Sequence, residues 1–178
     1  MTKYKFILIS FLALFMLTAC GDNKEENVNG TVENDNEENA GAGDNDKTEE
    51  GSKNVENEIN EVIVDNENIK ATLVKIVKVS DEVWGNSIEV IFDIENKRTD
   101  SIEVQARSVS ADGRMVDDTL ITMSQEIAPG KAATAKLEIM ETEGYEFPKL
   151  TSDFEMTLHV FSWENYDFEE DHPVKVQF

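Results

Sequence analysis

Residues 87–96 read SIEVIFDIEN, and this stretch decides the fold class. Large apolar side chains occupy every second position from Ile88 to Ile94, with acids between most of them. Successive side chains of a β-strand point to opposite faces of the sheet, so this alternation places the apolar set on one face and the acids on the other. The stretch therefore predicts a β-strand with one buried and one exposed face.

The same period of two recurs along the chain. It is found at residues 102–106, 133–139, 154–160 and 174–178. Residues 69–80 alternate as well, but their apolar phase slips between Leu73 and Val77, which predicts a β-bulge near residues 74–76. No comparable stretch shows the 3.6-residue period of a helix.

Turn residues separate these strands. Asp112-Gly113 is a strong hairpin signal, and Ala128-Pro129-Gly130-Lys131 fits a type II turn. Residues 96–100 form a polar corner, and residues 141–150 are the longest irregular link, with room for one helical turn. Seven or eight short strands within residues 61–178 predict an all-β fold, an antiparallel β-sandwich. The Cys–Trp–Cys pattern of antibody domains is absent, so an immunoglobulin-like resemblance is one of architecture.

The first twenty residues have a different composition. Lys3 and Lys5 precede an apolar run that continues to Ala19, and residues 6–19 are too few to cross a bilayer, which takes about 20 apolar residues. A short basic start followed by a short apolar run is typical of a signal peptide, which we assign to residues 1–19.

The residues that end this run are Leu17, Thr18, Ala19 and Cys20. They resemble the lipobox of bacterial lipoproteins. The resemblance implies that the Cys20 thiol receives a diacylglycerol, that cleavage makes Cys20 the first mature residue, and that the protein is held on the extracytoplasmic face of the cell membrane. Two acyl chains suffice for stable attachment. Cys20 is the sole cysteine of the sequence, so no intrachain disulfide can form.

Residues 21–60 hold thirteen acids, three lysines and few large apolar side chains. Such a segment cannot bury enough surface to offset the entropy of ordering it. We therefore predict that residues 20–60 comprise the lipidated cysteine and a disordered acidic linker, with a reach of about 35 Å that holds the domain of residues 61–178 away from the headgroups.

A second resemblance covers most of that domain. Its residues are IFDIENKRTDSIEVQARSVSADGRMVD at 91–117, SQEIAPGKAATAKLEI at 124–139 and DFEMTLHVFSWEN at 153–165. They resemble the C-terminal immunoglobulin-like domain of Gram-positive surface lipoproteins of unknown function. The resemblance implies a fold and a surface location, and it brings no catalytic residues.

Charge and composition bear on several function classes. The net charge of −22 disfavours nucleic acid as a partner, because Lys and Arg supply most of the affinity for phosphate backbones. The chain has no Gly-x-Ser-x-Gly elbow, no glycine-rich phosphate loop and two histidines, His159 and His172. We therefore predict a protein that is not an enzyme and needs no cofactor, because nucleophilic catalysis needs a nucleophile beside a base.

Two groups of residues are candidate sites. Acids gather before the last strand at Asp167, Glu169, Glu170, Asp171 and the adjacent His172. Carboxylates suit hard cations and histidine suits zinc, so this cluster is the basis of an alternative hypothesis, cation binding or delivery at the cell surface. Charge runs in loops are more often merely solvated, and we assign no metal ligand.

The second group is aromatic and comprises Phe161, Trp163 and Tyr166, with Phe168 nearby. If their face of the strand is exposed, aromatics rimmed by acids form an interaction surface for a protein or a glycan. In the alternative, the second sheet or residues 141–150 cover them, and this is the arrangement that we expect. The leading functional hypothesis is a non-enzymatic binding or structural module at the cell surface.

Overall fold

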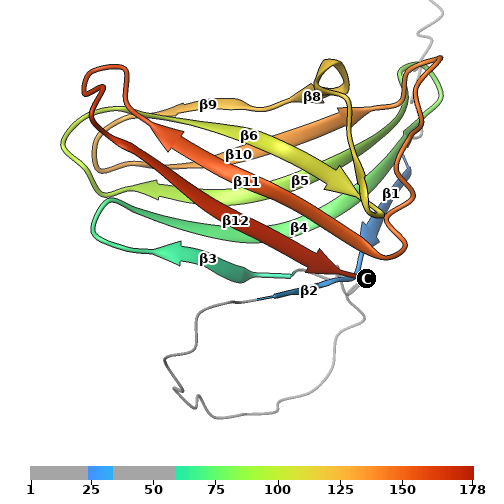
Figure 1. The fold of residues 1–178 in the computed structure, drawn as a ribbon, viewed down its shortest axis with the longest axis horizontal. Coiled ribbons are helices and arrows are strands. Elements are labelled where there is room, and N and C mark those ends of the chain that lie inside the picture. The colour runs from blue at the N-terminus through green and yellow to red at the C-terminus, as the bar shows by residue number, and fades with distance from the viewer. Residues whose placement is uncertain (1–23, 34–58) are drawn as a thin grey trace, which may run out of the picture.

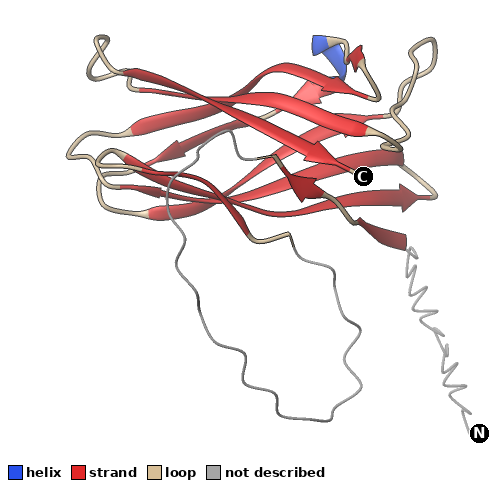
Figure 2. Ribbon diagram, turned by 60° about the horizontal axis from the view of Figure 1, so that its bottom comes forward, coloured by secondary structure: helices blue, strands red, loops and turns tan. Residues whose placement is uncertain are grey.

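The computed structural model describes residues 24–33 and 59–178, which form two antiparallel β-sheets packed face to face (Figures 1 and 2). The predicted β-sandwich is confirmed. Within these ranges there is no α-helix, only the 3₁₀ turn η1 (Asp118–Leu120), and no helix is long and apolar enough to span a membrane. The predicted signal peptide, Cys20 and residues 34–58 lie outside the described residues.

The first sheet is built around the two longest strands. In order across the sheet, its strands are β1 (Lys24–Val28), β4 (Ile69–Asp81), β5 (Gly85–Asn96), β10 (Ala132–Met140) and β8 (Ile121–Thr122). A further strand, β3 (Glu61–Asp65), pairs with the first part of β4, on residues 70–73, whereas β1 pairs with residues 76–80.

The second sheet lies opposite and contains the C-terminal strands. In order, its strands are β2 (Thr31–Val32), β12 (Glu169–Gln177), β11 (Asp153–Phe161), β6 (Ile102–Ala111) and β7 (Arg114–Met115). β9 (Ser124–Ile127) pairs with the start of β6. Residues 61–178 thus contribute eight strands of four or more residues and two of two residues, close to the predicted seven or eight.

The core lies between the sheets and is filled by the alternating residues. β5 buries Ile88, Val90, Phe92 and Ile94 completely, as its period of two predicts. β10, β11 and β12 contribute their inward residues in the same way, among them Leu137, Phe154, Leu158 and Val176. The predicted bulge is also present, because the register of β4 on β5 shifts between Leu73 and Lys75.

The turns follow the predicted chemistry. Asp112 and Gly113 both have positive φ, 52° and 72°, which is the pairing that a type I′ hairpin requires. Gly130 has φ 62° in the turn where the Lys131 N–H donates to the Ala128 carbonyl. Residues 141–152 are irregular and contain no helix.

The structure corrects the predicted linker. Residues 24–33 belong to the sandwich, because β1 continues the first sheet beside β4 and β2 continues the second sheet beside β12. Val28 is buried between them. The composition of this segment is polar, but edge strands bury few side chains and are held by backbone hydrogen bonds, which the sequence pattern does not reveal. A linker that runs freely from residue 21 to residue 60 is therefore wrong.

Gly30 shows how closely this segment packs. A Cβ atom added there would lie 2.3 Å from Cγ1 of Val176 and 3.0 Å from the ring of Phe178. Val176 is fully buried and cannot move aside cheaply. The backbone between β1 and β2 thus lies directly against the end of β12.

The connections between strands gather at two ends of the sandwich, the hairpin end and the corner end. The hairpin end carries the β4–β5 hairpin, the β6–β7 hairpin and the link at residues 141–152. The corner end carries the turn at residues 66–68, the β5–β6 corner, the β9–β10 turn and the β11–β12 loop. Figure 1 shows them at opposite ends of the long axis.

Candidate interaction surface

Of the aromatic residues predicted near the end of the chain, Trp163 and Tyr166 are exposed, whereas Phe161 and Phe168 are half-buried. Leu158 and Val160 of β11 point into the core, so His159 and Phe161 lie on the outer face of the second sheet. Trp163 and Tyr166 follow in the β11–β12 loop and are 63% and 83% exposed. For Trp163 and Tyr166, the expectation that the other sheet or residues 141–150 cover them is wrong, because that link lies at the hairpin end.

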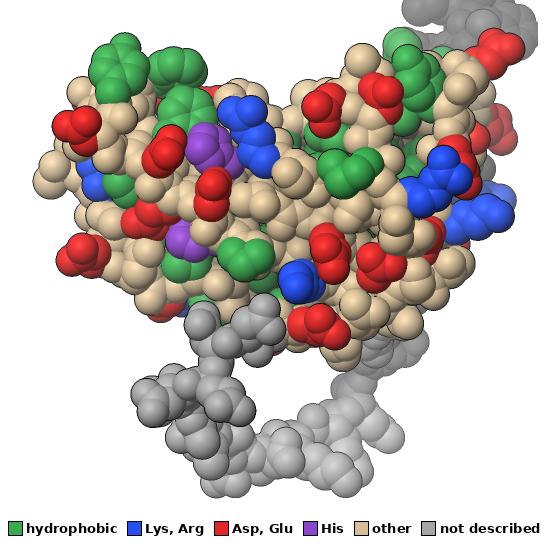
Figure 3. Space-filling model, viewed as in Figure 1, with side chains coloured by type: hydrophobic (Ala, Val, Ile, Leu, Met, Phe, Trp, Pro, Cys, Tyr) green, Lys and Arg blue, Asp and Glu red, His purple; other side chains and the backbone are tan. Residues whose placement is uncertain are grey.

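His159, Phe161 and Trp163 form a continuous aromatic ladder, and Tyr166 lies in the same loop as Trp163. The rings of His159 and Phe161 have centroids 5.2 Å apart, and those of Phe161 and Trp163 are 4.9 Å apart in an edge-to-face arrangement. Edge-to-face contacts are favourable because the positive ring edge meets the negative ring face. Nδ1 of His159 also lies 2.7 Å from Oδ1 of Asp171 on β12, so an acid borders the ladder (Figure 3 shows this face).

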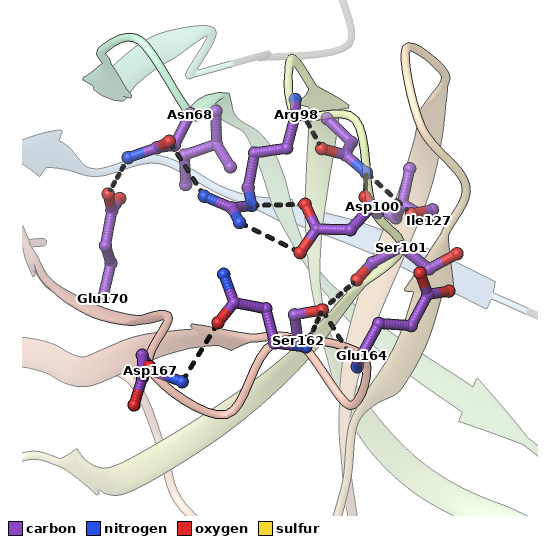
Figure 4. A network of polar contacts seen from close by, with 12 residues as sticks. Asn68, Arg98, Asp100, Ser101, Ile127, Ser162, Glu164, Asp167 and Glu170 are labelled. Atoms are coloured by element: carbon purple, nitrogen blue, oxygen red, sulfur yellow. Dashed lines mark hydrogen bonds and ion pairs between the residues drawn. The ribbon is translucent and has the colours of Figure 1, made fainter.

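The loop that presents Trp163 is held by Ser162 (Figure 4). This buried serine donates its hydroxyl hydrogen to the Ser101 carbonyl at 2.8 Å and accepts from the backbone N–H groups of Glu164 and Asn165. The Asn165 side chain in turn accepts from the N–H of Asp167. A loop with its backbone bonded in this way presents its aromatic side chains at a small cost in conformational entropy on binding.

Arg98 supports the loop from the β5–β6 corner. Its guanidinium donates two hydrogen bonds to Asp100, at 2.8 and 2.9 Å, and lies 3.7 Å from the centre of the Phe168 ring. The hydrogen bonds from Arg98 hold the pKa of Asp100 below its ordinary value. Bidentate and cation–π contacts fix both the position and the orientation of the guanidinium.

Glu170 connects the two sheets beside this corner. Burial acts to raise its pKa, but hydrogen bonds from Asn66 (2.9 Å), Asn68 (2.5 Å) and His172 (3.0 Å) outweigh burial and lower the pKa. Asn68 also accepts from Arg98, so the β3–β4 turn, the corner and β12 belong to one network (Figure 4). The Glu170 carboxylate therefore has its hydrogen-bonding partners within the protein.

The acidic cluster adopts a different arrangement from the one predicted. Residues 169–172 lie in β12 rather than in a loop, and a strand turns alternate side chains to opposite faces. Glu170 and His172 therefore face one way, while Asp171 faces His159 on the other side. Among residues 24–33 and 59–178, no group of three or more such side chains could hold a metal ion.

The exposed rings of Trp163 and Tyr166, beside the ladder on the outer face, can make apolar and stacking contacts. Flat aromatic faces pack against sugar rings or against the side chains of another protein, and aromatic residues dominate binding energy where they are buried on association. The nearby acids, Glu164, Glu169 and Asp171, can accept hydrogen bonds from hydroxyl groups or pair with cations.

The residues that hold the aromatic loop and its neighbouring corner could not be identified from the sequence. The sequence shows the turn pattern at residues 96–100, but it does not show that Arg98 packs on Phe168 or that Asn66 and Asn68 donate hydrogen bonds to Glu170. These contacts join residues as many as 104 positions apart, and no local pattern encodes them. An Arg and two Asn residues in tight connections were the available signal, and it is a weak one.

Comparison of the chain with protein-family models, with curated proteins and with solved structures finds no match.

Proposed function

We propose that this protein is a non-enzymatic binding module, held on the extracytoplasmic face of the cell membrane by a lipid on Cys20, that binds a protein or glycan through Phe161, Trp163 and Tyr166. The observation that carries the binding role is the exposure of Trp163 and Tyr166 on a loop whose backbone is held by Ser162 and whose base packs against Arg98. Exposed aromatics on a rigid support are typical of interaction surfaces.

The membrane attachment is supported by the sequence alone. Leu17-Thr18-Ala19-Cys20 stands at the end of a short apolar run, as the lipobox resemblance requires. A Cys20→Ala variant should lose its membrane attachment in fractionated cells, because the thiol that receives the lipid is gone. A variant that pellets with membranes as the wild type does, after salt washing, contradicts the anchor.

The binding surface can be tested by site-specific crosslinking in intact cells. A photoreactive amino acid at position 163 should give defined adducts, whereas the same group at Asp93, which is exposed on the outer face of the first sheet, should not. Trp163→Ser should then weaken binding of the identified partner by at least about tenfold, equivalent to about 1.4 kcal/mol. For a glycan partner, the same variant should lose retention on purified cell-wall polysaccharide.

The control is Thr134→Ser on the outer face of the first sheet, which should bind as the wild type does. Equal adducts from positions 163 and 93, or unchanged affinity in Trp163→Ser, would show that the aromatic ladder is not the binding surface. No observation in the described residues favours cation binding as a second candidate.

A further inference from the structure

The β4–β5 hairpin ends in an exposed apolar tip. Val83 and Trp84 are 76% and 78% exposed, although large apolar residues are costly to leave in water. The tip has a defined shape, because Oδ1 of Asp81 accepts hydrogen bonds from the N–H groups of both residues, at 2.6 and 2.8 Å. Gly85, with φ 85°, closes the turn.

The beginning of the described chain lies beside this hairpin. Lys24 is paired with Ser80, and β1 runs antiparallel to β4, so Lys24, the first described residue, lies at the end at which the tip projects (Figure 1). Three residues separate Cys20 from Lys24. Four residue steps span at most about 14 Å when fully extended.

Further apolar side chains are exposed at the same end. Met140 pairs with Ser87 just below the hairpin, Met115 lies in the β6–β7 hairpin, and Tyr145 lies in the link that follows β10. Of the eight large hydrophobic residues that are exposed in the described ranges, five lie at the hairpin end. They are Val83, Trp84, Met115, Met140 and Tyr145.

We propose that the hairpin end docks on the lipid bilayer that carries the Cys20 anchor, with Val83 and Trp84 inserted at headgroup depth. This inference rests on the proposed lipidation of Cys20. The tip projects about 10 Å beyond the Lys24–Ser80 pair, and the lipid is attached within about 14 Å of that pair, so both reach one plane. Tryptophan is the side chain that best suits this layer, because its ring is apolar and its N–H remains solvated.

Charge indicates how the tip is held. Lys24 and Lys78 flank the hairpin, but Asp81 and Glu82 lie within it and Glu141 is hydrogen-bonded to Asn86, so the local surface has no positive excess. Attraction to anionic headgroups therefore contributes little, and apolar insertion beside the lipid anchor holds the end in place. Docking should accordingly be insensitive to anionic lipid and to salt.

The proposal orients the whole protein. The hairpin end lies on the membrane, and the corner end, with Trp163 and Tyr166, points away from it. β4 spans thirteen residues, or about 40 Å, so the aromatic surface stands at about that height above the bilayer.

The two tryptophans allow a direct test. Full-length protein from a lipidating bacterial host is reconstituted into phosphatidylcholine vesicles as Trp163→Phe, which keeps Trp84, and as Trp84→Phe, which keeps Trp163. Vesicles with a doxyl label high on the acyl chain should quench Trp84 and leave Trp163 unchanged. Acrylamide in the water should quench Trp84 about threefold less than Trp163. Replacing part of the lipid with phosphatidylglycerol should change neither result.

Flotation of the vesicles separates the possible failures. If the protein does not float with them, the anchor is wrong, and the docking falls with it. If it floats but Trp84 is quenched by acrylamide and not by doxyl lipid, the anchor stands and the docking is overturned. If Trp84 is shielded from acrylamide without doxyl quenching, and more so at higher protein density, a second copy of the chain covers the tip and the proposal is wrong.

Discussion

Asn96 is the residue on which the β5–β6 corner depends. It is fully buried, and its side-chain amide nitrogen donates to the backbone carbonyls of Asp100 and Ile127 at 2.9 Å each. Its side-chain oxygen accepts from the backbone N–H of Arg98. One fully buried side chain thus satisfies three backbone groups. A buried polar group that loses its partner bears the full cost of desolvation.

Asn96→Ala should therefore lower the free energy of unfolding by about 2 kcal/mol, because it leaves two carbonyls and one N–H without their partners. Asn96→Asp should cost more, because a carboxylate would face the two carbonyl oxygens. Urea denaturation measures both changes. Asn86→Ala, which removes an exposed hydrogen bond to Glu141, is the control, and an equal loss in Asn86→Ala and Asn96→Ala would contradict this account of the corner.

Asp112 has a comparable role at the hairpin end. It accepts hydrogen bonds from four consecutive backbone N–H groups, those of residues 149–152, and from the hydroxyls of Thr151 and Ser152. Burial acts to raise its pKa, but these donors outweigh burial and lower the pKa to about 2. The ionised carboxylate is thus the form that the folded protein stabilises.

This stabilisation should depend on pH. The folded pKa lies below the ordinary value of 3.8, so the contribution is fully present above about pH 4 and is lost as the pH falls towards 2. Asp112→Asn should therefore cost about 1–2 kcal/mol at neutral pH, reduced for solvent screening, and almost nothing near pH 2. Thermal melts of wild type and variant across this range measure the difference. Asp93→Asn controls for the loss of one charge, and a pH-independent gap would contradict the prediction.

At the scale of elements, the segment that carries β1 and β2 extends both sheets. Its backbone crosses from the edge strand β4 to the edge strand β12, and it covers edges that would otherwise offer unpaired hydrogen-bonding groups to other chains. It also brings the described chain to the hairpin end within four residues of Cys20. The fold therefore limits how far the sandwich can stand from the proposed anchor.

Gly30→Ala should detach this segment while the sandwich stays folded. The added methyl group meets Val176 at 2.3 Å, and overpacking of this kind costs about 1–3 kcal/mol. Hydrogen exchange should become faster for the amides of residues 24–33 and remain unchanged in β5 and β10. Asn29→Ala, at an exposed neighbouring position, is the control. Unchanged exchange in residues 24–33 would show that the segment tolerates the methyl group and that its docking does not require Gly30.

At the scale of the whole molecule, the sandwich separates two surfaces along its long axis. One end carries the hairpin tip and the start of the described chain, and the other carries the aromatic ladder (Figures 1 and 3). If both proposals hold, a variant with Trp84→Ser should keep its partner affinity, whereas Trp163→Ser should keep its membrane docking. The two measurements are independent because the sites share no contacts.

The sequence determined the main strands of residues 61–178 and the class of fold. Ile88 to Ile94, Phe154 to Val160 and the Asp112-Gly113 pair act through local geometry: side chains alternate along a strand, and a tight hairpin needs positive φ. Both properties can be read from neighbouring residues. The Leu17–Cys20 pattern is local in the same sense, and it remains a prediction about attachment.

Only the tertiary structure decided the rest. The pairing of β1 and β2, the exposure of Trp163 and the network around Glu170 depend on which segments meet across the sandwich. Edge strands are held by backbone groups that every residue carries, so composition made residues 24–33 resemble a linker. Exposure of a face depends on what lies opposite it, and residues 141–150 could be placed at the far end only once the order of the strands was known.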